Sequence, residues 1–238
     1  MKRRTRIICV ITALLLLLAA GAVYVSDYYH AQPAAAELLN ADLPGVTVNT
    51  QYGRVVFRPE EFKAGLIFYP GGKVEYTAYT PLMIAFAEQG FLCILQSMPL
   101  NLAFFGMSAA DKIMADFPEI SSWYIAGHSL GGVAAGSYAA KHSSKLKGLI
   151  LLGAYTTSDL SRSGLQVLSM YGSNDGVLNR TQYEKNRAKL PADMTEVIIK
   201  GGCHAYFGDY GPQKGDGAPS ISREEQISQT AQEAGKLL

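Results

Sequence analysis

The chain has 238 residues, 48% of them hydrophobic, which suits one folded domain, or one domain with an appended segment, and a sizeable core. Its 21 basic and 20 acidic residues are mixed along the sequence and leave a net charge of +1, so no extended basic surface indicates a nucleic-acid partner. The three cysteines, Cys9, Cys93 and Cys203, are too few and too scattered for a disulfide framework, and no C-x-x-C spacing indicates a zinc site.

The N-terminal segment has the pattern of a membrane-targeting sequence. Basic residues up to Arg6 precede an uncharged apolar run over residues 7–25, which is long enough to cross a hydrocarbon core of about 30 Å as a helix. We therefore expect a signal anchor over residues 1–25, a single-pass helix with its basic end in the cytoplasm and the rest of the chain outside. The alternative is cleavage at Ala20-Gly21-Ala22, which would release a secreted protein after Ala22.

Residues 26–43 are expected to form a spacer between the membrane and a domain over residues 44–238. That domain begins with candidate strands at 46–49 and 54–58, which are separated by a Tyr-Gly turn and should form a hairpin.

The next landmark is a glycine-rich segment after a buried strand. The apolar run 66–69 is typical of a central strand, and Pro70-Gly71-Gly72-Lys73 follows it. A double glycine lets backbone N–H groups approach a ligand closely, so the N–H of Gly72 or Lys73 is a candidate for one half of an oxyanion hole. A plain glycine turn is the alternative.

A further buried strand is predicted over residues 91–95, and the connection at 98–105 is unusually apolar. Phe104 and Phe105 in this connection are candidates for lining a substrate pocket, although they could equally cover the core. Ser108-x-x-Asp111 is expected to cap the helix that follows.

The segment Gly127-His128-Ser129-Leu130-Gly131-Gly132 fits the G-x-S-x-G nucleophile elbow. It lies between an apolar run at 123–126 and a helix-compatible run at 133–141, which is the strand-to-helix context that the motif requires. Ser129 is then the candidate nucleophile, and the Leu130 N–H at the start of the helix is a candidate oxyanion donor. The alternative is a glycine-rich turn with an incidental serine.

Strands are next predicted at 148–152 and 167–171, and the connection between them is too short for a separate helical lid. Asp175 follows the second strand, where a catalytic acid is needed. A last strand at 197–199 leads to His204, which is the only histidine in a strand-end loop after Asp175 and hence the candidate general base. The same loop holds Tyr206, a candidate for contact with substrate.

The order serine, acid, histidine resembles the α/β-hydrolase superfamily over about residues 46–238. Three segments resemble its compact, lidless fold-5 group: Tyr69-Pro70-Gly71-Gly72-Lys73, the elbow, and Gly201-Gly202-Cys203-His204. The resemblance implies an α/β fold, with a mostly parallel twisted sheet and helices on both faces, and hydrolase activity. Dienelactone hydrolases are similar in size but carry cysteine at the elbow, and haloalkane dehalogenases carry aspartate there, so neither matches Ser129.

These features predict a membrane-anchored, extracytoplasmic serine hydrolase that cleaves small carboxylic esters with Ser129, His204 and Asp175, and without a metal or organic cofactor. A lipase, thioesterase or amidase could use the same triad. A relative of the fold that only binds ligands is a further alternative. Cys203 is expected to be a neighbour without a chemical role, or a thiol open to oxidation.

Overall fold

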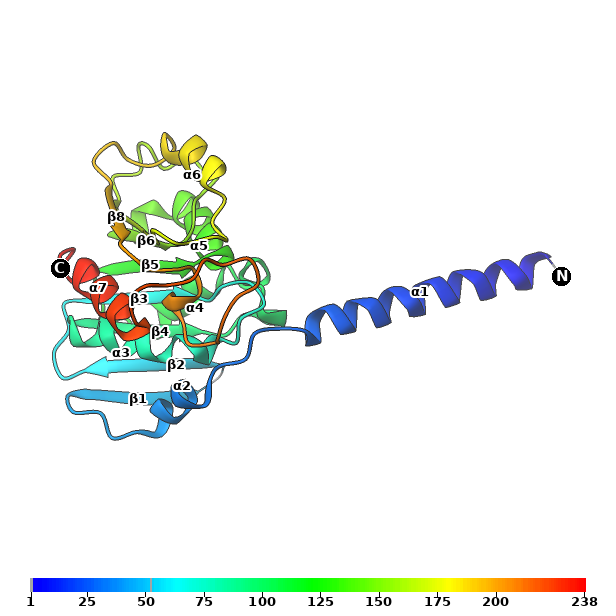
Figure 1. Ribbon diagram of the computed structural model, residues 1–238, viewed down its shortest axis with the longest axis horizontal. Coiled ribbons are helices and arrows are strands. Elements are labelled where there is room, and N and C mark those ends of the chain that lie inside the picture. The colour runs from blue at the N-terminus through cyan, green and yellow to red at the C-terminus, as the bar shows by residue number, and fades with distance from the viewer. Residues whose placement is uncertain (1, 52) are drawn as a thin grey trace.

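A computed structural model describes residues 2–51 and 53–238. The N-terminal helix α1 (Lys2–Ser26) projects away from the rest of the chain (Figure 1). Its span Arg3–Ser26 is long and apolar enough to cross a membrane, and none of it is buried against the rest of the chain. Both a membrane anchor and a signal sequence have these properties.

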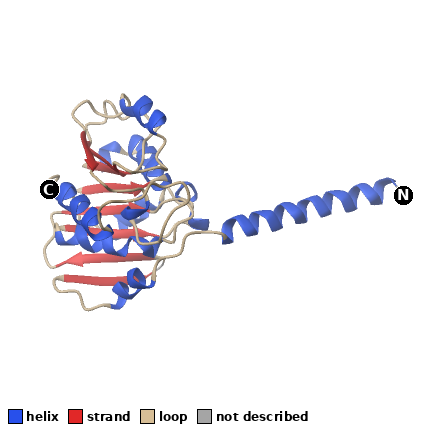
Figure 2. Ribbon diagram, in the orientation of Figure 1, coloured by secondary structure: helices blue, strands red, loops and turns tan. Residues whose placement is uncertain are grey.

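In the described part of the chain, eight strands form one sheet in the order β1-β2-β4-β3-β5-β6-β7-β8 (Figures 1 and 2). The antiparallel pairs β1–β2 and β2–β4 lie at one edge, and every pair from β4 to β8 is parallel. The expected hairpin and the mostly parallel α/β sheet are therefore confirmed. The strands are β1 (Val46–Gln51), β2 (Arg54–Pro59), β3 (Ala64–Tyr69), β4 (Phe91–Gln96), β5 (Trp123–His128), β6 (Gly148–Leu152), β7 (Gln166–Gly172) and β8 (Thr195–Ile199).

Helices cover both faces of the sheet, so the core has two halves (Figure 2). Side chains of β3 alternate between them: Leu66 and Phe68 pack with α3 and α7, whereas Ile67 and Tyr69 pack with α4 and α5. The α-helices after α1 are α2 (Pro33–Glu37), α3 (Thr80–Glu88), α4 (Ala109–Asp116), α5 (Leu130–Lys141), α6 (Arg180–Arg187) and α7 (Arg223–Gly235). Short 3₁₀ helices are η1 (Leu38–Asn40), η2 (Tyr76–Tyr79), η3 (Pro99–Asn101), η4 (Ala103–Phe105), η5 (Ser143–Lys145) and η6 (Ala205–Phe207).

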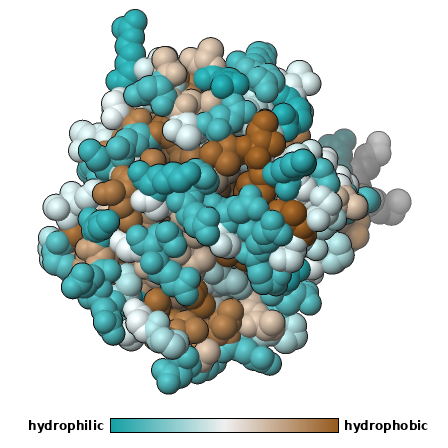
Figure 3. All heavy atoms as spheres, turned by 60° about the vertical axis from the view of Figure 1, so that its left-hand side comes forward, coloured by the Kyte–Doolittle hydropathy of each residue, from teal (hydrophilic) through white to brown (hydrophobic). Residues whose placement is uncertain are grey.

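The face on the far side of the domain from α1 is mixed, with hydrophobic residues in small patches between hydrophilic ones (Figure 3). Such scattered apolar residues are normal for a folded domain.

Residues 26–43, which we expected to form a spacer, lie against the domain from Tyr29 onward. Tyr29 forms a parallel bridge with Val74, the Gln32 N–H donates to the Asp209 carbonyl over 2.8 Å, and Ala35 is fully buried. The segment is therefore part of the packed structure.

The chain passes from β6 to β7 without a helix or strand, as the sequence predicted for residues 155–164. The capping box expected at Ser108 and Asp111 does not form, because neither side chain caps α4. The Asp111 carboxylate instead accepts hydrogen bonds from Tyr138 of α5, over 2.9 Å, and from Lys145, over 2.8 Å. Asp111 thus binds residues distant in the chain instead of capping its own helix.

Candidate active site

Ser129 occupies a strained backbone position between β5 and α5. Its φ of 52° and ψ of −122° lie in a region that residues other than glycine rarely adopt. The Ser129 N–H donates to the Leu152 carbonyl at the end of β6, over 2.9 Å, and its own carbonyl accepts from Gly132 and Val133 in the first turn of α5. These bonds hold the residue on both sides, as the strand-to-helix elbow requires.

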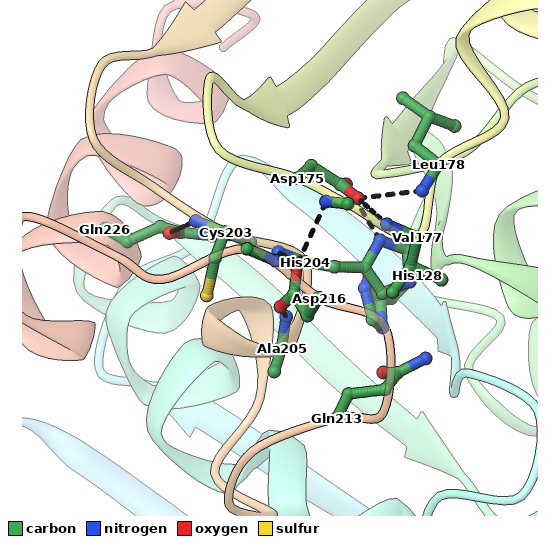
Figure 4. Close-up of polar contacts among 12 residues, drawn as sticks. His128, Asp175, Val177, Leu178, Cys203, His204, Ala205, Gln213, Asp216 and Gln226 are labelled. Atoms are coloured by element: carbon green, nitrogen blue, oxygen red, sulfur yellow. Dashed lines mark hydrogen bonds and ion pairs between the residues drawn. The ribbon is translucent and has the colours of Figure 1, made fainter.

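Asp175 and His204, which are 29 positions apart in the chain, form a buried hydrogen-bonded pair. His204 Nδ1 lies 2.8 Å from Asp175 Oδ2, with 1% and 0% of the respective side chains exposed. The other carboxylate oxygen, Oδ1, accepts from the backbone N–H groups of Val177 and Leu178 (Figure 4). Because these donors fix the carboxylate, its Oδ2 is directed at the imidazole.

The structure brings this pair to the elbow at the ends of adjacent strands. The rings of His204 and His128 have centroids 4.4 Å apart. Gly153 directly follows the Leu152 that holds Ser129, and a Cβ there would lie 2.9 Å from His204 Nδ1 and 3.1 Å from Asp175 Oδ2. His204 Nε2 is buried and, within residues 2–51 and 53–238, has no hydrogen-bond partner. With Nδ1 directed at the carboxylate, Nε2 is the ring nitrogen left without a partner among the described residues.

Asp216 also supports the pair, and nothing in the sequence singled it out. Its carboxylate accepts from the backbone N–H groups of His204 (3.1 Å), Ala205 (2.8 Å) and Gly176 (3.1 Å), as well as from its neighbour Gly217 (Figure 4). Burial alone would raise the pKa of Asp216, but these hydrogen bonds outweigh it and lower the pKa below 3.8. The carboxylate thus ties the histidine loop to the loop of the acid.

The candidate oxyanion donors have different surroundings. Among the described contacts, the N–H groups of Leu130 and Gly72 have no hydrogen-bond partner, and a Cβ on Gly72 would lie 2.7 Å from Leu130 Cδ2, so the two residues are neighbours. The Lys73 N–H donates to the Asn101 carbonyl over 2.8 Å. Lys73 is therefore occupied, and Gly72 is the remaining candidate after β3.

Comparisons with known proteins agree with this geometry. Residues 65–228 match the model of the α/β hydrolase family. The chain belongs to this family. Among curated proteins, no sequence matches it.

Solved structures similar to this α/β hydrolase include TT1662 from Thermus thermophilus, at 15% identity and a TM-score of 0.58, covering 81% of this chain and 96% of that one. A monoacylglycerol lipase from Paleococcus ferrophilus has 14% identity and a TM-score of 0.58, with 81% and 100% covered. The esterase domain of a Rhodothermus marinus protein has 13% identity and a TM-score of 0.58, with 77% and 90% covered. At these identities the likeness establishes the fold.

Phe104, Phe105 and Tyr206 were candidates for contact with substrate. Phe104 and Phe105 are 44% and 64% exposed. The Tyr206 ring lies 5.1 Å from the guanidinium of Arg223, and it lines a pocket of about 320 Å³ together with Cys203 and Asp216. The residues that line this pocket include neither Ser129 nor His204. A role in substrate contact stays a prediction for all three residues.

Cys203 precedes the candidate base and is almost fully buried. Burial, followed by the charge of Asp216, raises the pKa of Cys203 to about 12. Because the thiolate is the reactive form, this environment keeps the sulfur inert at neutral pH. The structure thus favours the expectation of a neighbour without a chemical role.

His128 links the elbow to the glycine-rich loop after β3. The Tyr79 hydroxyl accepts from the Gly71 N–H over 3.0 Å and lies 2.8 Å from His128 Nδ1. Its own proton can be donated to Nδ1 only if that nitrogen is unprotonated. Burial, and then the neighbouring His204, hold the pKa of His128 well below 6.5, so the ring is neutral at pH 7 and can accept this proton.

The buried neutral His128 is expected to make stability depend on pH. Its pKa is lower in the folded state than in the unfolded state, so below pH 6.5 the unfolded chain binds more protons and the folded state loses stability. The loss approaches about 1.4 kcal/mol per pH unit for one proton. Urea unfolding between pH 7 and pH 5 should show this decline in the wild type and a shallower one in His128→Asn. Equal slopes for the two proteins would contradict the assignment.

Proposed function

We propose that this α/β hydrolase is a serine hydrolase that cleaves carboxylic esters. The observation that carries the proposal is the buried Asp175–His204 pair, with Nε2 of its imidazole unpartnered, beside a serine held at a φ of 52°. A neutral imidazole with its Nδ1–H fixed by a carboxylate has a basic Nε2 available to a neighbouring hydroxyl. These are the requirements for activating a serine as a nucleophile.

In the proposed mechanism, His204 Nε2 accepts the proton of Ser129 Oγ as the oxygen attacks the ester carbonyl. Asp175 keeps the imidazole in the productive tautomer and stabilises its charged form. The Leu130 and Gly72 N–H groups donate to the oxyanion, each contributing on the order of 3 kcal/mol to lowering the barrier. His204 returns its proton to the leaving alcohol, and water, activated by the same base, then hydrolyses the acyl-enzyme.

A small ester is the substrate class that the surroundings of Ser129 favour. Residues 155–164 carry no lid, so little surface is available to enclose a long acyl chain. An esterase domain and a monoacylglycerol lipase are among the similar structures, which agrees with ester chemistry in general. Thioesters, amides and lipid esters are the alternative substrates for the same three residues. The alternative without catalysis is a protein that only binds its ligand.

We expect short acyl groups to be preferred in a series of p-nitrophenyl esters from acetyl to palmitoyl. Each methylene buried in an apolar pocket contributes about 0.8 kcal/mol, so kcat/KM should rise only over the first few carbons that an open site can contact. The control is the Ser129→Ala variant, whose rate gives the background. A steady rise to the longest chain, with a jump where the substrate aggregates, would favour a lipase instead. Absence of turnover above background with every ester would favour a binding protein.

We further propose that α1 is an uncleaved anchor that holds the catalytic domain outside the cytoplasm. The span Arg3–Ser26 supports anchoring by its length and composition, and the basic residues before it favour a cytoplasmic N-terminus.

In intact cells, added protease is expected to digest the domain after Val25 while cytoplasmic proteins survive. The protein should stay in the membrane fraction after a high-salt wash, because an apolar helix is not held by charge. A soluble form that begins at Val23 would show instead that the chain is cleaved after Ala22. Protection of the domain from protease until the cells are opened would overturn the proposed topology.

A further inference from the structure

Outside α1, exposed large apolar side chains concentrate in one loop of the hydrolase. In the described part of the chain they are Leu100 (53% exposed), Phe104 (44%), Phe105 (64%) and Ile198 (53%). The first three lie within six positions in the connection after β4. Single exposed apolar residues are normal, whereas a group of them marks a surface that contacts something apolar.

This apolar loop, residues 98–106, is fixed in place by Lys73. The Lys73 N–H donates to the Asn101 carbonyl, over 2.8 Å. Leu100 and Asn101 have φ values of 57° and 54°, a left-handed turn that few residues other than glycine adopt. The loop therefore has a defined shape that leaves Leu100 exposed.

The same Lys73 also holds the base of α1. Its carbonyl accepts from the Tyr29 N–H over 2.7 Å, and its ammonium donates to Asp27 over 3.0 Å and lies 4.4 Å from the centre of the Tyr24 ring. Asp27 directly follows α1, and Tyr24 lies in its last turn. One residue thus joins the apolar loop, the end of the candidate membrane helix and the glycine-rich loop that carries Gly72.

These contacts orient the domain relative to α1. The helix leaves the domain at the end of the sheet where β3 ends, which is the end that carries Ser129 (Figure 1). The face drawn in Figure 3, on the side away from α1, carries apolar patches between hydrophilic residues. An aromatic ring and a lysine at the end of an apolar helix are typical of the level of lipid headgroups, which would place the loop at the membrane surface.

We infer that the apolar loop docks on the bilayer that holds α1, with Leu100, Phe104 and Phe105 inserted among the lipids. The inference rests on the proposed anchoring of α1. The loop adjoins the base of α1 through Lys73, so an anchored α1 would hold the loop at the membrane surface. Lipid is therefore the apolar partner that we assign to it. Docking would turn the strand ends that carry Ser129 and Gly72 toward the bilayer.

Tryptophan fluorescence of the full chain in vesicles tests this inference. Phe105→Trp places a reporter in the loop, and Ile198→Trp places one at the other exposed apolar position, on β8. The native Trp123 is 5% exposed and provides the same background in each protein. In phosphatidylcholine vesicles with brominated acyl chains, the added emission of Phe105→Trp should be shifted to the blue and quenched, and that of Ile198→Trp should not. Wild-type emission should be unaffected.

Equal emission from the two variants, quenched or unquenched, would overturn docking through this loop. Because both positions are exposed, neither substitution should disturb the fold, and thermal unfolding at the wild-type temperature checks this. Leu100→Trp gives a second measurement from the same loop. Failure of docking is distinguishable from failure of the proposed function. Retention after a high-salt wash reports anchoring, and turnover of a soluble acetyl ester reports catalysis, whether or not the loop meets lipid.

Discussion

Ser129→Ala is expected to abolish hydrolysis of p-nitrophenyl acetate, with a fall in kcat of about 10⁶-fold or to background. No other hydroxyl in the described chain lies at the elbow between β5 and α5, and an alanine cannot attack the carbonyl. The same change should prevent labelling by a fluorophosphonate, which reacts only with an activated serine. Stability should be nearly unchanged, because alanine at this φ bears the same backbone strain as serine.

Ser137→Ala is the matched control, because Ser137 lies in α5, the helix that Ser129 precedes, and its hydroxyl donates to the Val133 carbonyl. This variant should keep both turnover and labelling. Normal labelling of Ser129→Ala would refute the serine mechanism. Loss of both signals in Ser137→Ala as well would show that the assay reports the integrity of α5 rather than the nucleophile.

The pairing of Asp175 with His204 could be anticipated from sequence because parallel strands end at one edge of a sheet. Each residue follows a strongly apolar run, β7 or β8, and such runs are the clearest strand signal. The topology then brings together residues that are 29 positions apart. The strands were predicted for the same reason, because short buried runs punctuated by glycine and proline leave few alternatives.

The features that the sequence did not predict depend on contacts between residues far apart in the chain. The choice between Gly72 and Lys73 depends on which N–H is occupied, and the acceptor for Lys73 is Asn101, in another loop. Asp111 has the spacing of a helix cap, but Tyr138 and Lys145 are its partners. Local patterns do not report such partners.

The packing of residues 26–43 against the domain was also not predicted from local composition. An alanine-rich and proline-rich composition is typical of a spacer, yet Ala35 is fully buried and Tyr29 bridges to Val74. Small side chains allow close packing on a surface, and the composition alone does not distinguish this from a solvated linker.

Gly131→Ala is expected to cause the largest loss of stability of any single methyl addition to the elbow. Inside a helix this change usually stabilises, by about 1 kcal/mol. Here a Cβ would lie 2.1 Å from the Tyr69 carbonyl oxygen and 2.3 Å from that of Pro70. Both are backbone atoms at the end of β3, which pairs with strands on both sides and cannot move away cheaply. We expect a loss of about 3 kcal/mol or more in the free energy of unfolding, measured with urea in detergent micelles.

Gly45→Ala separates this collision from backbone strain. Gly45 has a φ of 75° and nothing within 4 Å of an added Cβ, so its substitution costs only the left-handed conformation, about 1–2 kcal/mol. Gly131 has no positive φ, so its entire loss must come from the contact of α5 with the end of β3. If Gly131→Ala is no less stable than Gly45→Ala, then α5 does not approach β3 so closely. The elbow would then lack the tight packing that holds Ser129 in its strained conformation.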